Sequence, residues 1–308
     1  MQPVALLFVY SLICLGASLA GGWIPLVVEL THKRMQIAIS FVSGIVLGIG
    51  LLHLLPHSFA ALGSIDATMF WVLGGFLFMF FLERFFHFHH HEAPGEESPL
   101  LEDGGCGHDH SPAPAHAHHH HGHGHNYGQG DNGHGHSRLA FSWVGVIIGL
   151  TLHGLVDGVT LAAAVKSEES HGVLLAGIGA LLAIALHKPF DSLTIGTMMA
   201  AAGKSTRARH LLNAAYALVT PLGIILFYTL SSAAGSSAGL GQTLGFAAGA
   251  FLCIATGDLL PELQFHRHDR VALSASLLAG IALAWGTVFL ESSGHDHYHG
   301  PEAAREAQ

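Results

Sequence analysis

Charged side chains are scarce in this chain of 308 residues, because Asp, Glu, Lys and Arg make up only 11% of it. Soluble domains carry about 25% charged residues, so an ordinary soluble domain is excluded. Half of the residues are hydrophobic and the mean hydropathy is +0.47, which indicates a membrane protein. The net charge of −9 says little about the whole molecule, because the charges lie in loops and tails, and nothing in the composition suggests a nucleic-acid partner.

Cysteine is also rare. The three cysteines, Cys14, Cys106 and Cys253, lack the spacing of a metal site, and we expect them to be packing or indifferent thiols. The His-Glu-x-x-His motif of zinc proteases is absent as well, which argues against an enzyme of that type. Histidine and carboxylate side chains therefore remain as the candidates for metal chemistry.

What the chain does have is long apolar runs. Eight of them reach the roughly 20 residues that a spanning helix needs, which predicts an all-α polytopic membrane protein. They lie near 3–29, 36–56, 68–86, 139–165, 172–201, 210–231, 243–264 and 271–291. The first run has no basic segment before it and exceeds the apolar core of a signal peptide, so we expect a retained helix.

The basic residues predict the orientation. Nine of the twelve lie in one set of alternate loops: Lys33, Arg34, Arg84, Arg138, Lys204, Arg207, Arg209, Arg267 and Arg270. The other loops and the tail hold only Lys166 and Arg305. By the positive-inside rule, we expect both termini to be external. We also expect the protein to lie in the cell membrane, either plasma or inner. The predicted segments are spans one to three in 1–86, a cytoplasmic loop at 87–137, spans four to eight in 138–293, and an external tail at 294–308.

Spans two and seven contain an internal repeat. Residues 44–57, "GIVLGIGLLHLLPH", match residues 249–262, "GAFLCIATGDLLPE", at six of fourteen positions. Polar residues also align, His53 with Asp258 and His57 with Glu262. The predicted topology makes the two copies inverted, as in many carriers, although chance among apolar letters is the alternative. The prediction is a pathway with His53 and His57 near the outer mouth, and Asp258, Glu262 and His266 near the inner one.

Spans four and five each carry a His-x-x-x-Asp pair, His153 with Asp157 and His187 with Asp191. Residues at i and i+4 share one helix face. Two imidazoles and two carboxylates on adjacent helices suit Zn²⁺, Fe²⁺ or Mn²⁺. The alternative is that each side chain forms hydrogen bonds within the bundle, but ionisable groups in spans are usually functional. Pro189 removes one backbone donor beside the proposed ligands and leaves the carbonyl of Ala185 without its helical partner.

Residues 87–136 form a second metal signal, since they hold fifteen of the 27 histidines among Gly, Pro and Asp. No apolar core can form there, so we expect a disordered cytoplasmic loop that buffers metal weakly at many sites. The tail segment "GHDHYHG" at 294–300 predicts a smaller external collector.

Together these residues resemble the ZIP (Zrt-/Irt-like) family of divalent-metal transporters. The motif "HGLVDG" at 153–158 is similar to the family's His-Ser-x-x-Glu-Gly, "HKPFD" at 187–191 to its His-Lys-x-x-Glu, and "DLLPE" at 258–262 to its motif in span seven. The resemblance implies import of Zn²⁺ or a similar ion such as Cd²⁺, an elevator-like movement of the central helices, and a homodimer. It also implies a transport site of His153, Asp157, His187 and Asp191.

The chain departs from the family where some members bind a second metal. The corresponding positions are Gly154, Lys188 and Thr220, and none supplies a carboxylate. Both motif carboxylates are Asp where the family usually has Glu. Our hypothesis is that Lys188 replaces the second ion as a fixed positive charge beside Asp191, because a cation within about 4–6 Å favours an ionised carboxylate. The alternative is a lysine that snorkels to the interface.

Two other functions use similar residues. A cation-diffusion exporter also has His and Asp in its spans and a His-rich loop, but about six spans and a folded cytoplasmic tail domain. A membrane metalloenzyme needs histidines clustered at the membrane face. The eight spans and the inverted repeat favour transport over both.

Overall fold

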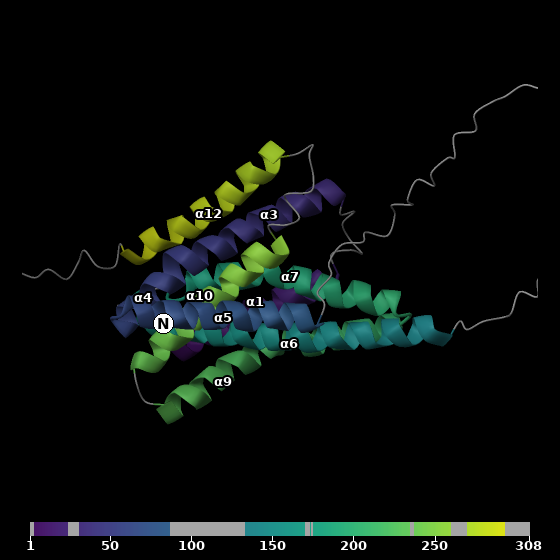
Figure 1. Ribbon diagram of the computed structural model, residues 1–308, viewed down its shortest axis with the longest axis horizontal. Helices are drawn as coiled ribbons and strands as arrows, with labels where there is room; N and C mark the ends of the chain where they lie inside the picture. The colour runs from purple at the N-terminus through teal and green to yellow at the C-terminus, as the bar shows by residue number, and fades with distance from the viewer. Residues whose placement is uncertain are drawn as a thin grey trace, which may run out of the picture.

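The computed structural model describes residues 3–23, 31–86, 133–169, 173, 175–234, 237–259 and 270–292, and within them every regular element is a helix (Figure 1). The elements are α1 (Pro3–Gly21), α3 (His32–Ile49), η1 (Gly50–Leu54), α4 (Leu55–Leu62), α5 (Ile65–Phe86), α6 (Gly133–Glu169), α7 (Ile178–Ala201), α8 (Thr206–Ala217), α9 (Val219–Ala234), α10 (Ser237–Ile254), η2 (Ala255–Leu259) and α12 (Arg270–Ser292). Loop 87–132 and the tail from residue 293 lie outside the described residues.

The described helices provide eight segments long and apolar enough to cross a membrane, which confirms the predicted number. The second span is longer than predicted, because α3, η1 and α4 run on as Lys33–Leu62. The sixth span consists of α8 and α9, which break at Leu218. Pro221 lies in the first turn of α9, where its missing N–H would have no helical partner in any case.

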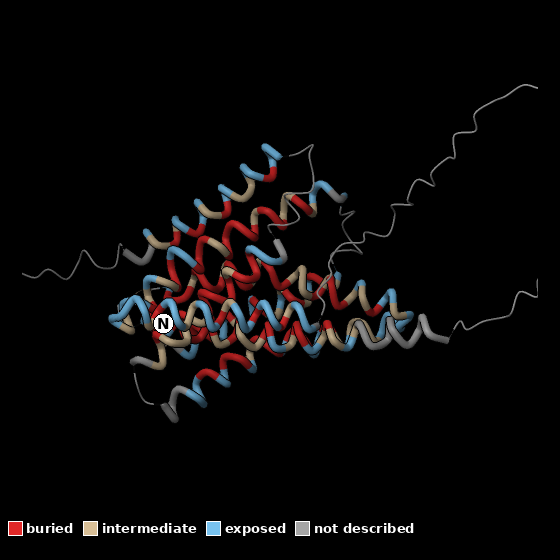
Figure 2. Tube along the Cα trace, in the orientation of Figure 1, coloured by how far each residue is buried: buried red, intermediate tan, exposed pale blue. Residues whose placement is uncertain are grey.

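The outer faces of these helices are apolar, and polar groups lie inside. Figure 2 shows exposed residues along the outside of the assembly and buried ones at its centre. On α1 the exposed residues include Val4, Phe8 and Leu12, whereas Ser18 is buried. Soluble proteins show the opposite distribution of polar and apolar residues, so this one agrees with helices surrounded by lipid.

The two copies of the repeat share an unusual backbone feature. A turn of π-helix, η1 and η2, occupies the same five aligned positions in each copy. In η1 the amide of Leu55 donates to the carbonyl of Gly50, five residues back. The following Pro56 has no N–H to donate, and π-turns are a common adjustment of such a helix. The Leu-Leu-Pro sequence that the two copies share is therefore accompanied by the same π-helical turn in both.

Hydrogen bonds fix the relative direction of the two copies. Ser43 Oγ donates to the carbonyl of Ala255 at 3.3 Å, and Ser58 Oγ donates to that of Gly241 at 2.7 Å. Early residues of one copy therefore face late residues of the other, so α3–α4 and α10 run antiparallel. This is the inverted arrangement that the topology predicts.

Close glycine contacts divide the helices into two groups. A side chain on Gly44 of α3 would meet the carbonyl of Leu277 on α12, and one on Gly249 of α10 would meet that of Val72 on α5. Gly44 and Gly249 are equivalent positions of the repeat, so the pairs α3–α12 and α10–α5 are built alike. We call α3, η1, α4, α5, α10, η2 and α12 the frame.

The second group contains α1 and α6 to α9, and we call it the central bundle. Helix α6 packs along α9, with Gly158 against the carbonyl of Thr220, and α7 packs along α1, with Gly21 against Pro189. The central bundle meets the frame mainly where α6 lies against α10 and α7 against α3. Contacts within each group are more extensive than contacts between the groups, which allows the groups to move as units.

Candidate metal centre

The four predicted ligands come together inside the central bundle. His153 and Asp157 project from α6, and His187 and Asp191 from α7, with one ligand atom of each within 4.8 Å of all the others. His153, Asp157 and His187 are buried, and the side chain of Asp191 is 13% exposed. We call these four residues the central cluster.

The ligand-atom distances suit a small cation. His187 Nε2 lies 3.3 Å from Asp157 Oδ2 and 3.4 Å from His153 Nε2. His153 Nε2 lies 3.6 Å from Asp157 Oδ2 and 3.9 Å from the Oδ2 atom of Asp191. Tetrahedral Zn²⁺ with bonds of about 2.0–2.2 Å requires ligand atoms roughly 3.3–3.6 Å apart, so the cluster is close to that geometry.

The backbone of α7 orients one ligand. His187 Nδ1 lies 2.8 Å from the carbonyl oxygen of Ala183, which can only accept, so Nδ1 donates and Nε2 is left to bind a metal. Helix α7 continues through Pro189, so the proline removes one backbone hydrogen bond without ending the helix. The packing of Gly21 against Pro189 leaves no room there for a side chain.

Lys188 lies inside the cluster instead of reaching an interface. Its side chain is 1% exposed, and its Nζ is 2.7 Å from Asp157 Oδ2 and 3.6 Å from Asp191 Oδ2. The sequence predicted proximity to Asp191 at i+3, but the shorter contact is to Asp157 on the neighbouring helix. A Cβ on Gly154 would be 3.1 Å from Nζ, so the ammonium fills the space beside that glycine.

Tyr216 of α8 completes the surroundings of Lys188, and sequence reasoning missed it. The Tyr216 hydroxyl donates to Asp191 Oδ2 at 2.8 Å and accepts from Lys188 Nζ at 3.2 Å, and its ring centroid is 4.9 Å from Nζ. A lone tyrosine has no motif. Its position four residues before Thr220 was no signal either, because α8 and α9 break at Leu218 between the two residues.

Comparison with known proteins identifies the family of the chain. The pattern of the ZIP zinc transporter family matches residues 4–290, which is nearly the whole chain. The chain belongs to the ZIP family. Zinc transporter ZIP9-B of Xenopus laevis is 31% identical over 175 residues, covering 52% of this chain and 56% of that protein. Zinc transporter ZIP1 of Bos taurus is 28% identical over 148 residues, covering 47% and 44%. The chain thus spans about half the length of the curated relatives that it matches.

Membership in the ZIP family confirms the resemblance drawn from the motifs and the absence of an enzymatic role, since ZIP proteins are transporters. It also sets aside the cation-diffusion and metalloenzyme alternatives. The family match does not assign roles to individual residues, so the geometry above carries the argument for the central cluster.

The predicted pathway residues are only partly described. His53 of η1 and His57 of α4 lie together beside Glu168 at the end of α6, which sequence reasoning also missed. Asp258 lies in η2, where its backbone alone is described. Glu262 and His266 lie outside the described residues, so their placement stays a prediction.

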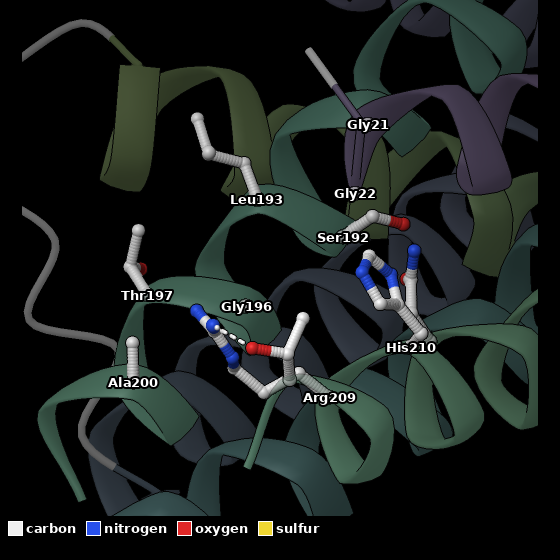
Figure 3. A pocket seen from close by; sticks show the side chains of 11 residues that line it. Gly21, Gly22, Ser192, Leu193, Gly196, Thr197, Ala200, Arg209 and His210 are labelled. Atoms are coloured by element: carbon white, nitrogen blue, oxygen red, sulfur yellow. Dashed lines mark hydrogen bonds between the residues drawn. The ribbon is translucent and has the colours of Figure 1, made fainter. Parts of the chain in front are cut away.

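A cavity of about 150 Å³ lies along the C-terminal half of α7, next to α8 (Figure 3). Its lining includes Gly21 of α1 and the following Gly22, Ser192 and Gly196 of α7, and Asn213 of α8. Ser192 directly follows Asp191, so the cavity lies beside the segment of α7 that carries this ligand.

Proposed function

We propose that this ZIP protein carries divalent metal ions, with Zn²⁺ as the main substrate, across the membrane into the cytoplasm through one ion site. The site consists of His153, Asp157, His187 and Asp191, with Fe²⁺, Mn²⁺ or Cd²⁺ as other substrates of the same ligand set. The observation that supports it most strongly is four ligand atoms within 4.8 Å of one another, on two adjacent spanning helices. Such a group is costly in a membrane unless it is used.

We further propose that the site holds a single ion, because Lys188 occupies the second position. Its ammonium is 2.7 Å from Asp157 Oδ2, and each carboxylate oxygen has lone pairs for both a metal and a hydrogen-bond donor. A second divalent cation next to a buried ammonium would be repelled strongly. Gly154 and Thr220, the other two positions, provide no charge in its place.

The proposed movement carries the central bundle past the frame, so that the central cluster faces alternate sides of the membrane. The cavity beside Ser192 supports an arrangement in which the cluster is reached from the end of α7 that precedes Lys204. By the positive-inside prediction, this end is cytoplasmic. We place His53 and His57 on the entry side, and Asp258, Glu262 and His266 on the exit side. External termini, a location in the cell membrane, a homodimer and a metal-buffering loop at 87–136 belong to the same proposal.

The test is uptake by proteoliposomes that contain a metal-sensitive dye. Initial rates are compared for Zn²⁺, Fe²⁺, Mn²⁺ and Cd²⁺ with the wild type, with His187→Ala, and with His118→Ala as a control that removes a histidine from the loop. Loss of a ligand is expected to lower the Zn²⁺ rate at least about tenfold, whereas His118→Ala transports normally. Equal rates for His187→Ala and the wild type would refute the proposed site.

A further inference from the structure

A second group of metal-ligating side chains lies outside the central cluster. It consists of His53 of η1, His57 of α4 and Glu168 of α6, whose ligand atoms all lie within 4.8 Å of one another. His53 and Glu168 are each 1% exposed, and His57 is partly buried. We call these three residues the outer cluster.

The carboxylate of Glu168 is held in a fixed orientation. Its Oε2 accepts a hydrogen bond from the backbone N–H of Gly177 at 2.8 Å, at the start of α7. Its Oε1 lies 2.7 Å from His53 Nε2. The ring of His57 follows, with its centroid 4.9 Å from that of His53. One carboxylate oxygen is thus anchored to the backbone while the other faces the two imidazoles.

We propose that the outer cluster is a second divalent-metal site, distinct from the central one, that binds zinc-like ions. Two imidazole nitrogens and one carboxylate oxygen form a typical ligand set for such ions, and a water would take the fourth position. The ion replaces the proton shared by His53 Nε2 and Glu168 Oε1, and that proton passes to solvent. The gap of 2.7 Å between these atoms then opens to roughly 3.3 Å, the spacing in a tetrahedral zinc site.

The outer cluster lies in line with the central cluster. Glu168 follows Asp157 by eleven residues, which is close to three helical turns, so both carboxylates project from one face of α6 about 16 Å apart. Thr160 and Ala164 lie on that face between them, and both are buried. Among the described side chains, the hydroxyl of Thr160 has no hydrogen-bond partner. The hydroxyl of Thr160 therefore provides a polar group on this face between the two clusters.

The outer cluster also joins the two groups of helices. His53 and His57 belong to the frame, and Glu168 belongs to the central bundle. A side chain on Gly179 of α7 would be 3.8 Å from the ring of His53, so α7 also reaches this junction. An ion bound here bridges the two groups, and any sliding of one past the other separates its ligands. That an imported ion binds first at the outer cluster rests on the proposed function, whereas metal binding at the outer cluster does not.

The alternative is that Glu168 only fastens the start of α7 through Gly177 and a hydrogen bond to His53. Glu168→Gln separates the two roles, because the amide oxygen still accepts from Gly177 while a neutral side chain binds metal poorly. Glu169→Gln is the matched control, since Glu169 is the next residue and is exposed. His57→Gln is a second test, because His57 is only partly buried and its loss disturbs folding least.

The decisive experiment uses the full chain, purified free of metal and then equilibrated with Zn²⁺. Diffraction at the zinc absorption edge from wild-type crystals is expected to give one anomalous peak at the central cluster and another between His53 Nε2 and Glu168 Oε1. Equilibrium binding is expected to show one zinc fewer per chain in Glu168→Gln and in His57→Gln than in Glu169→Gln. The loop histidines contribute equally to all three, so they cancel in this difference.

A peak at the central cluster without one at the outer cluster overturns the proposal, and so does equal stoichiometry in Glu168→Gln and Glu169→Gln. These outcomes are separate from failure of the proposed function. That failure appears as unchanged uptake in His187→Ala, and it leaves the zinc peak at His53 and Glu168 unaffected.

Discussion

The central and outer clusters use the same ligand chemistry but are built on different supports. All four residues of the central cluster belong to α6 and α7, so their mutual distances survive any movement of the central bundle as a unit. The outer cluster takes His53 and His57 from the frame and Glu168 from the central bundle. The first arrangement suits a site that travels with its ion, and the second suits a contact that is made and broken at each cycle.

The clusters also differ in their own charge. The central cluster contains a buried ammonium, that of Lys188, 2.7 Å from Asp157. In the outer cluster the carboxylate of Glu168 instead contacts the imidazole of His53 and the backbone N–H of Gly177. The four ligands of the central cluster can therefore stay close together without metal, because Lys188 compensates part of their negative charge.

The largest effect is expected for Lys188→Met, which removes that compensation. Breaking a buried ion pair leaves an uncompensated charge and lowers the free energy of unfolding by about 3–5 kcal/mol. Thermal unfolding in metal-free buffer measures the loss. Added Zn²⁺ should restore more stability in Lys188→Met than in the wild type, because the ion then supplies the missing positive charge.

Lys166→Met is the matched control for this prediction. Lys166 is exposed on α6 and its Nζ lies 5.6 Å from the ring centroid of Phe227, so its loss should change the stability by less than about 1 kcal/mol. If Lys188→Met is no less stable than Lys166→Met, the ammonium does not hold the central cluster together.

The frame should depend on close packing instead of charge. A side chain on Gly75 of α5 would collide with the carbonyl of Phe246 on α10, whereas one on the adjacent Gly74 would meet open space. Gly75→Ala is expected to lower the free energy of unfolding by about 1–3 kcal/mol through overpacking, and Gly74→Ala to leave it nearly unchanged. Thermal unfolding with and without Zn²⁺ tests this. Zn²⁺ should raise the stability of both variants by the same amount, because it binds only the folded protein. A larger gain in Gly75→Ala than in Gly74→Ala would contradict the separation of frame and central bundle.

A smaller effect is expected for Tyr216→Phe, which keeps the ring and removes the hydroxyl that donates to Asp191. Partners that orient metal ligands contribute about 10- to 100-fold to affinity. We expect the lower end, about tenfold weaker Zn²⁺ binding at the central cluster, because Lys188 still orients Asp191. Measuring the Kd in a Glu168→Gln background isolates this site. An unchanged Kd would show that Lys188 alone positions the carboxylate.

Most of the architecture could be predicted because its signals are local in the sequence. The spans follow from run length, and the inverted repeat follows from fourteen aligned residues. The pairs His153–Asp157 and His187–Asp191 follow from the i, i+4 spacing, which puts both members on one helix face. These signals need no knowledge of how the helices pack.

The missed residues depend on packing between helices. Tyr216 reaches Asp191 from α8, and Glu168 reaches His53 from α6, and no spacing rule connects either pair. The same reason explains Lys188, since the i, i+3 rule identified Asp191 but not the closer Asp157 on the adjacent helix. Glu168 also lies outside the predicted fourth run at 139–165, in the segment "KSEE", where three of four residues are charged.

The smallest effect is expected for changes in the loop at 87–136, because the residues of both clusters lie outside it. Replacement of 87–136 by a flexible linker of about ten Gly and Ser residues should change the initial Zn²⁺ uptake rate by no more than about twofold, because shortening a flexible connection shifts its closure entropy only slightly. Dye-loaded proteoliposomes measure the rate at saturating and at low Zn²⁺. A variant with all fifteen loop histidines replaced by glutamine is the control that keeps the connection at full length.

Comparison of the two variants identifies what the loop does. If both transport normally at saturating Zn²⁺ and differ from the wild type only at low Zn²⁺, the histidines buffer the ion while the two clusters carry it. If the linker variant alone fails, the length of the connection between α5 of the frame and α6 of the central bundle limits their movement. Loss of all flux in the glutamine variant would make the loop histidines part of the pathway, and the two clusters would then be an incomplete account of it.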